Sequence, residues 1–338
     1  MVCEKMGKLN NEELKKLLSC IRKNPKVTVP PMAGFDSGVH RLGEKYVVIS
    51  TDPCTGVPEK WFGWLLINYA ASDVALFAAK PEFCTINLLG PLGTEPKVFQ
   101  EVMRQACGAA DELDMAIVTG HTGTYSGLSK LVGVCTAYGT VQPEKLITPG
   151  NAKAGDLILC TKPVGLETAV NFSLTNKALS RKMFSAERTE ELAKLVSMQS
   201  CVKEALQLAQ LGGVHAMHDA TEGGLTAALN EVAEASHLGF QMEFEKVPVS
   251  PEALKLKPVF KLSDDQMLSM SSTGTIIAGV DPQSKGRVED SLSENGCQAS
   301  FIGEFTENKN RVLAKDKKKT FFPEAADDPY AMILSGKV

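Results

Sequence analysis

The chain has 338 residues, 43% of them hydrophobic, which is enough to bury a sizeable core and to form two domains. Its formal net charge is only −4, with lysine and arginine spread along the chain, so no basic footprint for nucleic acid or cationic membrane-binding stretch is indicated. We therefore expect a small or anionic ligand, and neither a nucleic acid nor a membrane as partner.

The cysteines and the first ten residues indicate the cellular compartment of the protein. None of the nine cysteines forms a C-x-x-C pair, and most lie in apolar segments, which favours reduced, packed thiols over a disulfide framework or a zinc site. Residues 1–10 lack the apolar core of a signal peptide, and no apolar run reaches membrane-spanning length. These features predict a cytoplasmic protein.

The first half alternates predicted helices and strands. We expect helices at 11–21, 61–79 and 95–113 and strands at 46–52, 83–89, 115–119 and 131–141. The first strand ends on Asp52, and the long apolar helix carries Asn68 and Asp73, which need partners because an unpaired buried polar group costs about 1–3 kcal/mol. Asp73 could be a ligand, or it could pair inside the fold.

A glycine turn is expected at Gly120–Gly123, directly after the predicted strand 115–119. Residues 143–155 contain two prolines and two glycines without an apolar period, so we place the domain boundary near residue 150. The predicted domains are 1–150 and 151–338.

The second half continues with strands at 156–161, 240–244, 276–280 and 301–305 and helices at 167–174, 186–211 and 284–295. The segment after Val312 is rich in lysine and then in acidic residues, and we expect it to be mobile at the surface. The alternation of strands and helices in both halves predicts an α/β (α+β) fold with layered sheets and helices.

The stretch from Val214 to Ser236 carries the strongest functional signal. An apolar run is followed by polar residues from His218 to Glu222, two glycines, and an amphipathic helical pattern, so we predict strand, glycine turn and helix. The start of a helix favours an anion, and Asp219 could hold a divalent cation against it. The alternatives are a site for nucleotide phosphate and magnesium, or an ordinary glycine turn capped by Asp219.

Taken together, these loops and carboxylates resemble the aminoimidazole ribonucleotide synthetase (PurM-like) superfamily, and most of all its HypE-type hydrogenase maturation proteins. The resemblance covers nearly the whole chain in order. It rests on Gly34-Phe-Asp-Ser-Gly-Val39, Ser50-Thr-Asp52, Asn68 with Asp73 and Ala79-Lys-Pro81, Thr119-Gly-His-Thr122, and His218-Asp-Ala-Thr-Glu-Gly-Gly-Leu225 with Asn230-Glu-Val-Ala-Glu-Ala-Ser236.

The resemblance implies a fold and a chemistry. The amino-terminal domain would bind ATP and pair in a homodimer through a shared barrel, and a carboxy-terminal α/β domain would lie beneath a nucleotide cleft. A maturation protein is a possible partner. ATP and Mg²⁺ are the implied cofactors, with phosphoryl transfer to an oxygen or another nucleophile. The metal would be held by Asp36, Asp52, Asp73 and Asp219.

The same resemblance assigns roles residue by residue. The catalytic candidates are Asp52, Asp73, Asp219 and His121. The residues expected to bind the nucleotide are Gly34, Asp36, Ser37, Gly38, Asn68, Thr119, Gly120, Thr122, His218 and Thr221. His121 stands where typical HypE members carry an acid, so it could contact phosphate, carry a proton, or be structural. His218 could reach the phosphates or cap the turn.

The chain lacks three features that are typical of individual members of this family. HypE proteins end in a carbamoyl-accepting cysteine, and no cysteine follows Cys297 here, so we do not expect that chemistry on a tail thiol. The segment Met32–Asp36 lacks the reactive cysteine of selenophosphate synthetases, and Ser271–Gly274 differs from the acidic segment of thiamine monophosphate kinases.

Three functional hypotheses follow from these observations. The first is an ATP- and Mg²⁺-dependent enzyme that activates a small molecule or carboxamide. The second is a non-catalytic nucleotide-binding or assembly protein of the same fold, and the third is a small-molecule kinase resembling thiamine monophosphate kinase.

Overall fold

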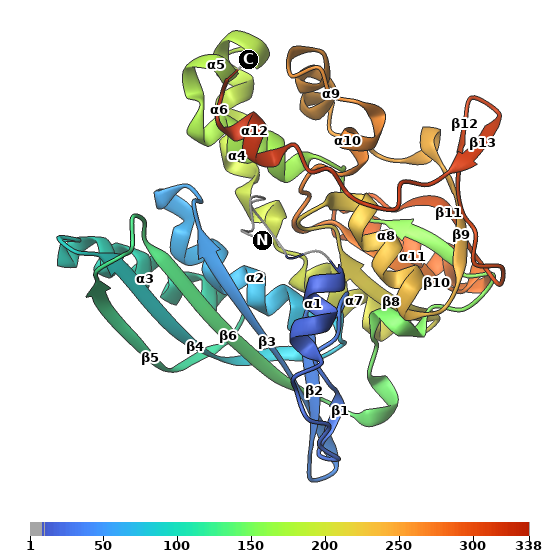
Figure 1. Ribbon diagram of the computed structural model, residues 1–338, viewed down its shortest axis with the longest axis horizontal. Helices are drawn as coiled ribbons and strands as arrows, with labels where there is room; N and C mark the ends of the chain where they lie inside the picture. The colour runs from blue at the N-terminus through green and yellow to red at the C-terminus, as the bar shows by residue number, and fades with distance from the viewer. Residues whose placement is uncertain (1–8, 10, 338) are drawn as a thin grey trace. The chain divides into compact units, whose positions relative to one another are not determined.

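The computed structural model describes residue 9 and residues 11–337, which form two compact units. The small unit comprises residues 22–31 and 35–146, and the large unit comprises the described residues up to 21, residues 32–34, and the chain from 147 onward. Each unit combines one sheet with helices, which confirms the predicted α/β class (Figure 1).

The small unit is built on a six-stranded sheet in the order β1-β2-β3-β6-β4-β5. Only β4 and β5 pair in parallel, and the other neighbours are antiparallel. The strands are β1 (Val27–Val29), β2 (Ser37–Leu42), β3 (Lys45–Thr55), β4 (Lys80–Pro91), β5 (Ala116–Tyr125) and β6 (Val132–Val141), and the helices are α2 (Phe62–Leu76) and α3 (Pro96–Glu112).

Helix α2 lies between the sheet and α3, contacting strands β3, β4 and β6 on one side and α3 on the other. Every residue of α2 except Tyr69 is buried, which explains its nearly continuous apolar sequence. The close approach to α3 depends on Gly63, where a Cβ would lie 2.0 Å from the main-chain oxygen of Val102. A side chain is therefore excluded at this helix crossing.

The predicted glycine turn at residues 120–123 is wrong. Strand β5 runs unbroken through these residues and pairs with β4 as far as Tyr125. Gly120 is needed for another reason, because a Cβ there would lie 2.3 Å from the main-chain oxygen of Ile86 on β4. The glycine thus permits close strand pairing and does not reverse the chain.

The large unit has a seven-stranded sheet in the order β13-β12-β9-β11-β7-β10-β8, with only β12 and β9 pairing in parallel. Its strands are β7 (Leu157–Cys160), β8 (Val214–Asp219), β9 (Gly239–Glu243), β10 (Ile276–Val280), β11 (Ser300–Thr306), β12 (Arg311–Lys315) and β13 (Lys318–Phe321). Its helices are α1 (Asn11–Leu18), α4 (Leu166–Thr175), α5 (Lys177–Phe184), α6 (Ala186–Lys194), α7 (Val202–Leu211), α8 (Gly224–Ala235), α9 (Pro251–Val259), α10 (Asp264–Leu268), α11 (Lys285–Glu294) and α12 (Tyr330–Leu334).

Helix α8 supplies much of the core of the large unit. The apolar face predicted for it is buried, and Leu225, Leu229 and Val232 pack in one cluster with Phe240 and Phe305 of the sheet. The strand, glycine turn and helix predicted from 214–236 are therefore confirmed as β8, the turn and α8. Among the described residues, no helix has both the length and the apolar character needed to cross a membrane.

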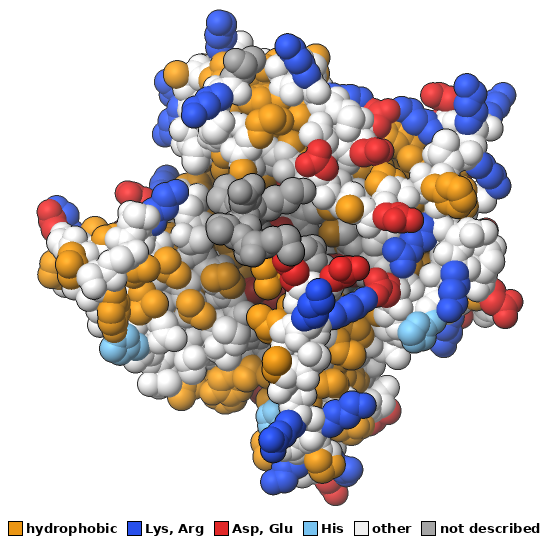
Figure 2. All heavy atoms as spheres, in the orientation of Figure 1, with side chains coloured by type: hydrophobic (Ala, Val, Ile, Leu, Met, Phe, Trp, Pro, Cys, Tyr) orange, Lys and Arg blue, Asp and Glu red, His pale blue; other side chains and the backbone are white. Residues whose placement is uncertain are grey.

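The segment after Val312 is ordered, contrary to the expected mobile surface tail. It completes β12, forms β13, and then runs back over the large unit, with Phe322 and Ile333 buried. Lysine side chains gather on the β12–β13 hairpin (Figure 2), where they protect an exposed sheet edge against pairing with another chain. The basic composition therefore reflects an edge strand.

The helix crossing at Gly63 gives a stability prediction. Replacing Gly63 with Ala forces a methyl group into the backbone of α3 and should lower the free energy of unfolding by about 2 kcal/mol or more. Gly108→Ala on α3 is the matched control, because nothing lies near its added Cβ, and it should be neutral or stabilising by up to about 1 kcal/mol. Urea denaturation of the two variants measures the difference, and equal losses would contradict the assigned crossing.

Candidate functional site

The junction between β8 and α8 is the first part of the candidate site. Strand β8 ends on Asp219, and the turn that follows uses Gly223 and Gly224 at φ values of +81° and +55°, which favour glycine. A Cβ on Gly224 would also lie 2.3 Å from the main-chain oxygen of Met270. The two glycines therefore let the chain enter α8 directly below the carboxylate-bearing end of the strand.

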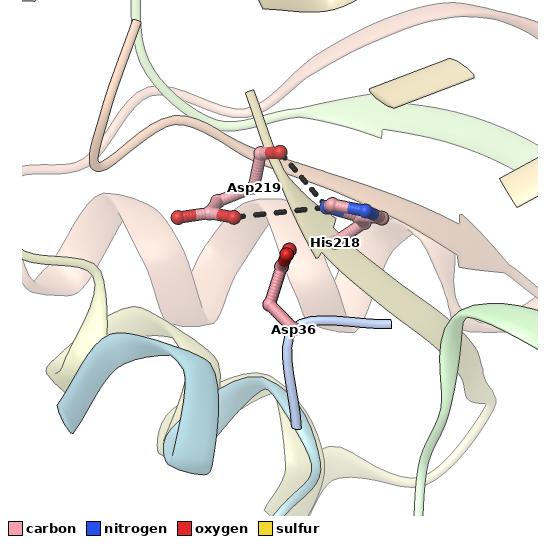
Figure 3. Close-up of side chains that lie close together, drawn as sticks. All are labelled: Asp36, His218 and Asp219. Atoms are coloured by element: carbon pink, nitrogen blue, oxygen red, sulfur yellow. Dashed lines mark hydrogen bonds and ion pairs between the residues drawn. The ribbon is translucent and has the colours of Figure 1, made fainter. Parts of the chain in front are cut away.

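His218 and Asp219 are adjacent residues at the end of β8, and both are buried. Figure 3 shows the His218 ring turned toward Asp219, with Nδ1 donating to the Asp219 main-chain oxygen at 2.9 Å (Figure 3). The other ring nitrogen, Nε2, lies 2.9 Å from Oε2 of Glu231 on α8. His218 is thus held between its neighbour and α8, an arrangement that fits a positioning role for the ring.

Asp219 has an unusual environment for a buried carboxylate. It is 2% exposed, and its Oδ1 has no hydrogen-bond partner among the residues that the structure describes. His218 Nδ1 is 3.6 Å from this oxygen, beyond hydrogen-bond distance. A buried anionic oxygen without a donor is costly unless a cation is bound, so Asp219 fits a metal ligand.

The anion-binding position of the glycine turn is filled by a residue that the sequence did not indicate. Oδ2 of Asp328 accepts from the Gly223 main-chain N–H at 3.0 Å and from Ser271 Oγ at 2.6 Å. Thr221, also predicted to bind nucleotide, lies within the turn, where its main-chain oxygen accepts from Gly224 at 2.9 Å. No spacing in the sequence pointed to Asp328, because it lies more than a hundred residues beyond the turn.

Glu167, at the start of α4, is a second residue that sequence reasoning missed. Its Oε2 accepts from the Thr273 main-chain N–H at 2.8 Å. Burial, with a smaller contribution from the charges of Asp328 and Glu222, raises the pKa of Glu167 to about 7 against the lowering effect of the Thr273 hydrogen bonds. The large unit therefore places one carboxyl group with a near-neutral pKa, that of Glu167, beside the loop 271–275.

In the small unit, Asp52 and Asp73 are directed to the same side of the sheet. Ser50 on β3 donates to Asp73 Oδ2 on α2 at 2.7 Å. Asp52 is two residues further along β3 and so faces the same side as Ser50. Consistent with this, burial and then the charge of Asp52 raise the pKa of Cys54, the next residue on that face.

Gly34 and Asp36 lie in the loop that leads into β2, and Ser37 and Gly38 are the first two residues of that strand. Ser37 pairs with Ser50 of β3, which places the start of β2 beside the strand that carries Asp52. Ser37 Oγ is buried and has no hydrogen-bond partner within the described part of the chain, so it retains capacity for a ligand. Gly34 adopts φ +78°, in agreement with a glycine-dependent loop.

The side chain of Asn68 forms a hydrogen bond within its own helix. Its Nδ2 donates to the Trp64 main-chain oxygen at 3.0 Å, one turn earlier in α2. Asp73 is five positions after Asn68 in α2, so the two side chains point about 140° apart around the helix. The structure therefore does not bring Asn68 and Asp73 together.

The β5 candidates are separated from Asp52 within the small unit. Strand β5 is the sheet edge, three strand spacings or about 14 Å from β3. By the strand register, Thr119 and His121 face the side of the sheet opposite Asp52, whereas Thr122 faces the α2 side. His121 Nε2 lies 2.5 Å from the hydroxyl of Tyr125, so its ring already has a structural contact.

Comparisons with known proteins agree with this architecture. The family models for AIR synthase related protein match residues 34–141 with the N-terminal domain and residues 153–315 with the C-terminal domain. The chain is 25% identical over 284 residues to a putative hydrogenase expression/formation protein of Methanocaldococcus jannaschii, covering 82% of this chain and 81% of that protein. It is 28% identical over 246 residues to carbamoyl dehydratase HypE of Bradyrhizobium diazoefficiens, covering 72% and 68%.

A solved structure gives the same result for the fold. The hydrogenase maturation protein HypE in complex with ATP superposes with a TM-score of 0.71 at 18% identity, covering 96% of this chain and 97% of that one. The two-domain PurM-like fold expected from the sequence is therefore confirmed.

Glu167 gives a testable pH dependence. Its pKa is about 7 in the folded protein against an ordinary value of 4.5, so the folded state binds the proton more tightly, and stability should fall as pH rises from about 4.5 through about 7. Glu167→Gln, which keeps an acceptor for Thr273, should flatten this decline and stabilise the protein at pH 8 by about 3 kcal/mol. Urea denaturation at several pH values measures the free energy of unfolding of the wild type and of Glu167→Gln. Glu289→Gln, on the exposed face of α11, is the control. An unchanged pH profile would contradict the assignment.

Proposed function

Because the chain belongs to the AIR synthase related family, we propose that it is an ATP- and Mg²⁺-dependent enzyme that activates a small molecule, such as a carboxamide, by phosphoryl transfer. The observation that carries this proposal is the buried Asp219 carboxylate, whose Oδ1 lacks a donor in the described chain and lies at the start of a glycine turn. The ATP bound by the similar HypE structure supports the choice of nucleotide.

The proposed roles follow the chemistry of the side chains. Asp36, Asp52, Asp73 and Asp219 would together hold the metal, since magnesium prefers oxygen ligands and carboxylates above all. Magnesium would supply charge neutralisation on the polyphosphate. The chain's own part is to position the reactants: Ser50 orients Asp73 by its hydrogen bond, and His218 holds the end of β8 against Glu231.

A nucleotide-binding protein without turnover is a second candidate. It is favoured by the carboxylate of Asp328, which already satisfies the Gly223 N–H that a phosphate would use. The position of His121 on the opposite face of the sheet from Asp52 also counts against His121 as a general base beside that aspartate. Release of ADP by the wild-type protein separates the two candidates.

We further propose that the open face of the small unit's sheet pairs with a second copy of the chain. Helices α2 and α3 cover one face only. The other face carries Ile49, Phe83 and Val118, which are 37%, 41% and 56% exposed, and Phe83 stacks on Tyr138 with ring centroids 5.5 Å apart. Hydrophobic side chains over this sheet are visible in Figure 2. An apolar sheet face of this kind favours association.

The aspartates give the direct functional test. Asp219→Asn and Asp52→Asn should each lower Mg²⁺-dependent ADP release by about 100-fold or more, since each removes a charge that holds the metal. Asp290→Asn on the exposed part of α11 should leave the rate unchanged. Coupled-enzyme detection of ADP measures this, with thermal melting as a check on folding. Activity that survives both substitutions would contradict the proposal, and ATP binding without any ADP release by the wild type would select the second candidate.

The dimer proposal has its own test. Phe83→Asp places a charge on the open face and should raise the dissociation constant of the dimer at least tenfold. Phe321→Asp is the control, because Phe321 is 83% exposed on the β13 edge of the other sheet. Sedimentation equilibrium measures the dissociation constants of the wild type and the two variants. An unaltered mass for Phe83→Asp, or a monomeric wild type, would show that this face does not pair.

A further inference from the structure

Three donors from distant parts of the chain converge on the Asp328 carboxylate at the start of α8, and the main-chain N–H of Tyr330, two residues further on, donates to its Oδ1 at 2.9 Å. The Gly223 main-chain N–H and Ser271 Oγ donate to Oδ2 of Asp328 at 3.0 Å and 2.6 Å. The Ser271 main-chain N–H donates to Oδ1 at 3.3 Å. Ser271 is 4% exposed, and α8 is twelve residues long, so a buried hydroxyl and the positive end of a full helix face the same anion. Asp328 therefore occupies an anion-binding site formed by a helix N-terminus and a buried hydroxyl.

Asp328 belongs to a segment, residues 322–334, that we call the strap. The strap crosses the large unit, buries Phe322 and Ile333, and receives hydrogen bonds from four side chains. These are Asn230 to the Pro323 main-chain oxygen at 2.8 Å, Gln266 to Asp327 at 2.9 Å, Asn171 to the Tyr330 hydroxyl at 2.9 Å, and Asn176 to the Leu334 main-chain oxygen at 2.8 Å. The strap also covers the turn closely, since a Cβ on Gly223 would lie 2.9 Å from the Cβ of Ala326.

The charge of Asp328 is opposed by its surroundings. Glu167 and Glu222 lie close enough that the charges of Asp328 and Glu222 both raise the pKa of Glu167. Like charges at short range repel, and this repulsion offsets part of the stabilisation from the three donors. The Asp328 carboxylate is therefore held less tightly than its donors alone would hold it.

The groups beneath the strap are polar. Asn171, on α4, donates to Tyr330 and accepts from Gln199 Nε2 at 3.0 Å. Gln199 ends the short helix η4 (Leu195–Gln199) and is buried, and its Oε1 has no hydrogen-bond partner within the described residues. Release of the strap would therefore expose side chains with unused hydrogen-bonding capacity, together with the apolar surface that Phe322 and Ile333 now cover.

We propose that Gly223 and Ser271 form a phosphoryl-binding site for which Asp328 is a displaceable internal ligand. A phosphoryl group, from a nucleotide or from a phosphorylated small molecule, replaces the Asp328 carboxylate on the same three donors, and the strap is released. A phosphoryl oxygen suits these donors because it is a charged acceptor at a helix N-terminus. The inference rests on the proposed function and adds regulation to it, because occupancy of the site and closure of the strap exclude one another.

Hydrogen exchange and binding measurements test the proposal on the full chain. In the wild type, a non-hydrolysable ATP analogue or pyrophosphate should increase amide exchange across residues 322–334. Asp328→Asn should show this increase without ligand and should bind the anions about tenfold more tightly, because the internal competitor loses its charge. Asp327→Asn is the matched control, since this neighbour bonds to Gln266 and not to the turn. It should behave as the wild type.

The outcomes separate this inference from the proposed function. Nucleotide binding with equal affinity in wild type and Asp328→Asn, and with unchanged exchange in the strap, would overturn the inference alone. Strap release by pyrophosphate but not by the ATP analogue would support the phosphoryl site and count against nucleotide as its ligand. The wild-type exchange measurement does not depend on the variant folding, so a misfolded Asp328→Asn would still leave the proposal open to refutation.

Discussion

The large unit depends on one local constraint, the two positive φ values at Gly223 and Gly224. They allow the chain to pass from β8 into α8 through a short turn, residues 220–223. This passage places a buried carboxylate, Asp219, and the N–H groups of a helix start within the same few residues. Any residue with a Cβ at position 224 would collide with the Met270 carbonyl. A substitution there would therefore disturb both the turn and the position of Asp219.

Two kinds of charge are arranged around this junction. Asp219 keeps an oxygen for which the described chain provides no donor, whereas Asp328 is surrounded by donors. The first arrangement suits a cation and the second an anion, and a metal–polyphosphate unit would present both. The small unit offers a comparable carboxylate pair, in which Asp73 is fixed by Ser50 and Asp52 lies on the same face of the sheet. That all four aspartates hold one metal remains our proposal.

The sequence predicted the features that local rules control. The helical period of 224–235 and the preceding glycine pair identified β8, the turn and α8, because periodicity and positive φ are visible in a short window. Gly120 was misinterpreted because glycine serves two purposes, chain reversal and close approach, and only the strand register distinguishes them. The strap was missed because its composition is polar and its partners, Asn230 and Asn171, lie far away in the chain. The burial of Glu167 is likewise a property of tertiary packing, which no sequence pattern reports.

The central claim is that carboxylates from distant parts of the chain hold one metal on a nucleotide. A crystal structure with a non-hydrolysable ATP analogue and Mn²⁺ tests it most directly, because anomalous scattering locates manganese without ambiguity. The account predicts a manganese peak bound by Asp219 together with Asp36, Asp52 or Asp73, next to the phosphates. A nucleotide whose metal lies away from Asp219, or one bound with no carboxylate from residues 36, 52 and 73, would contradict it.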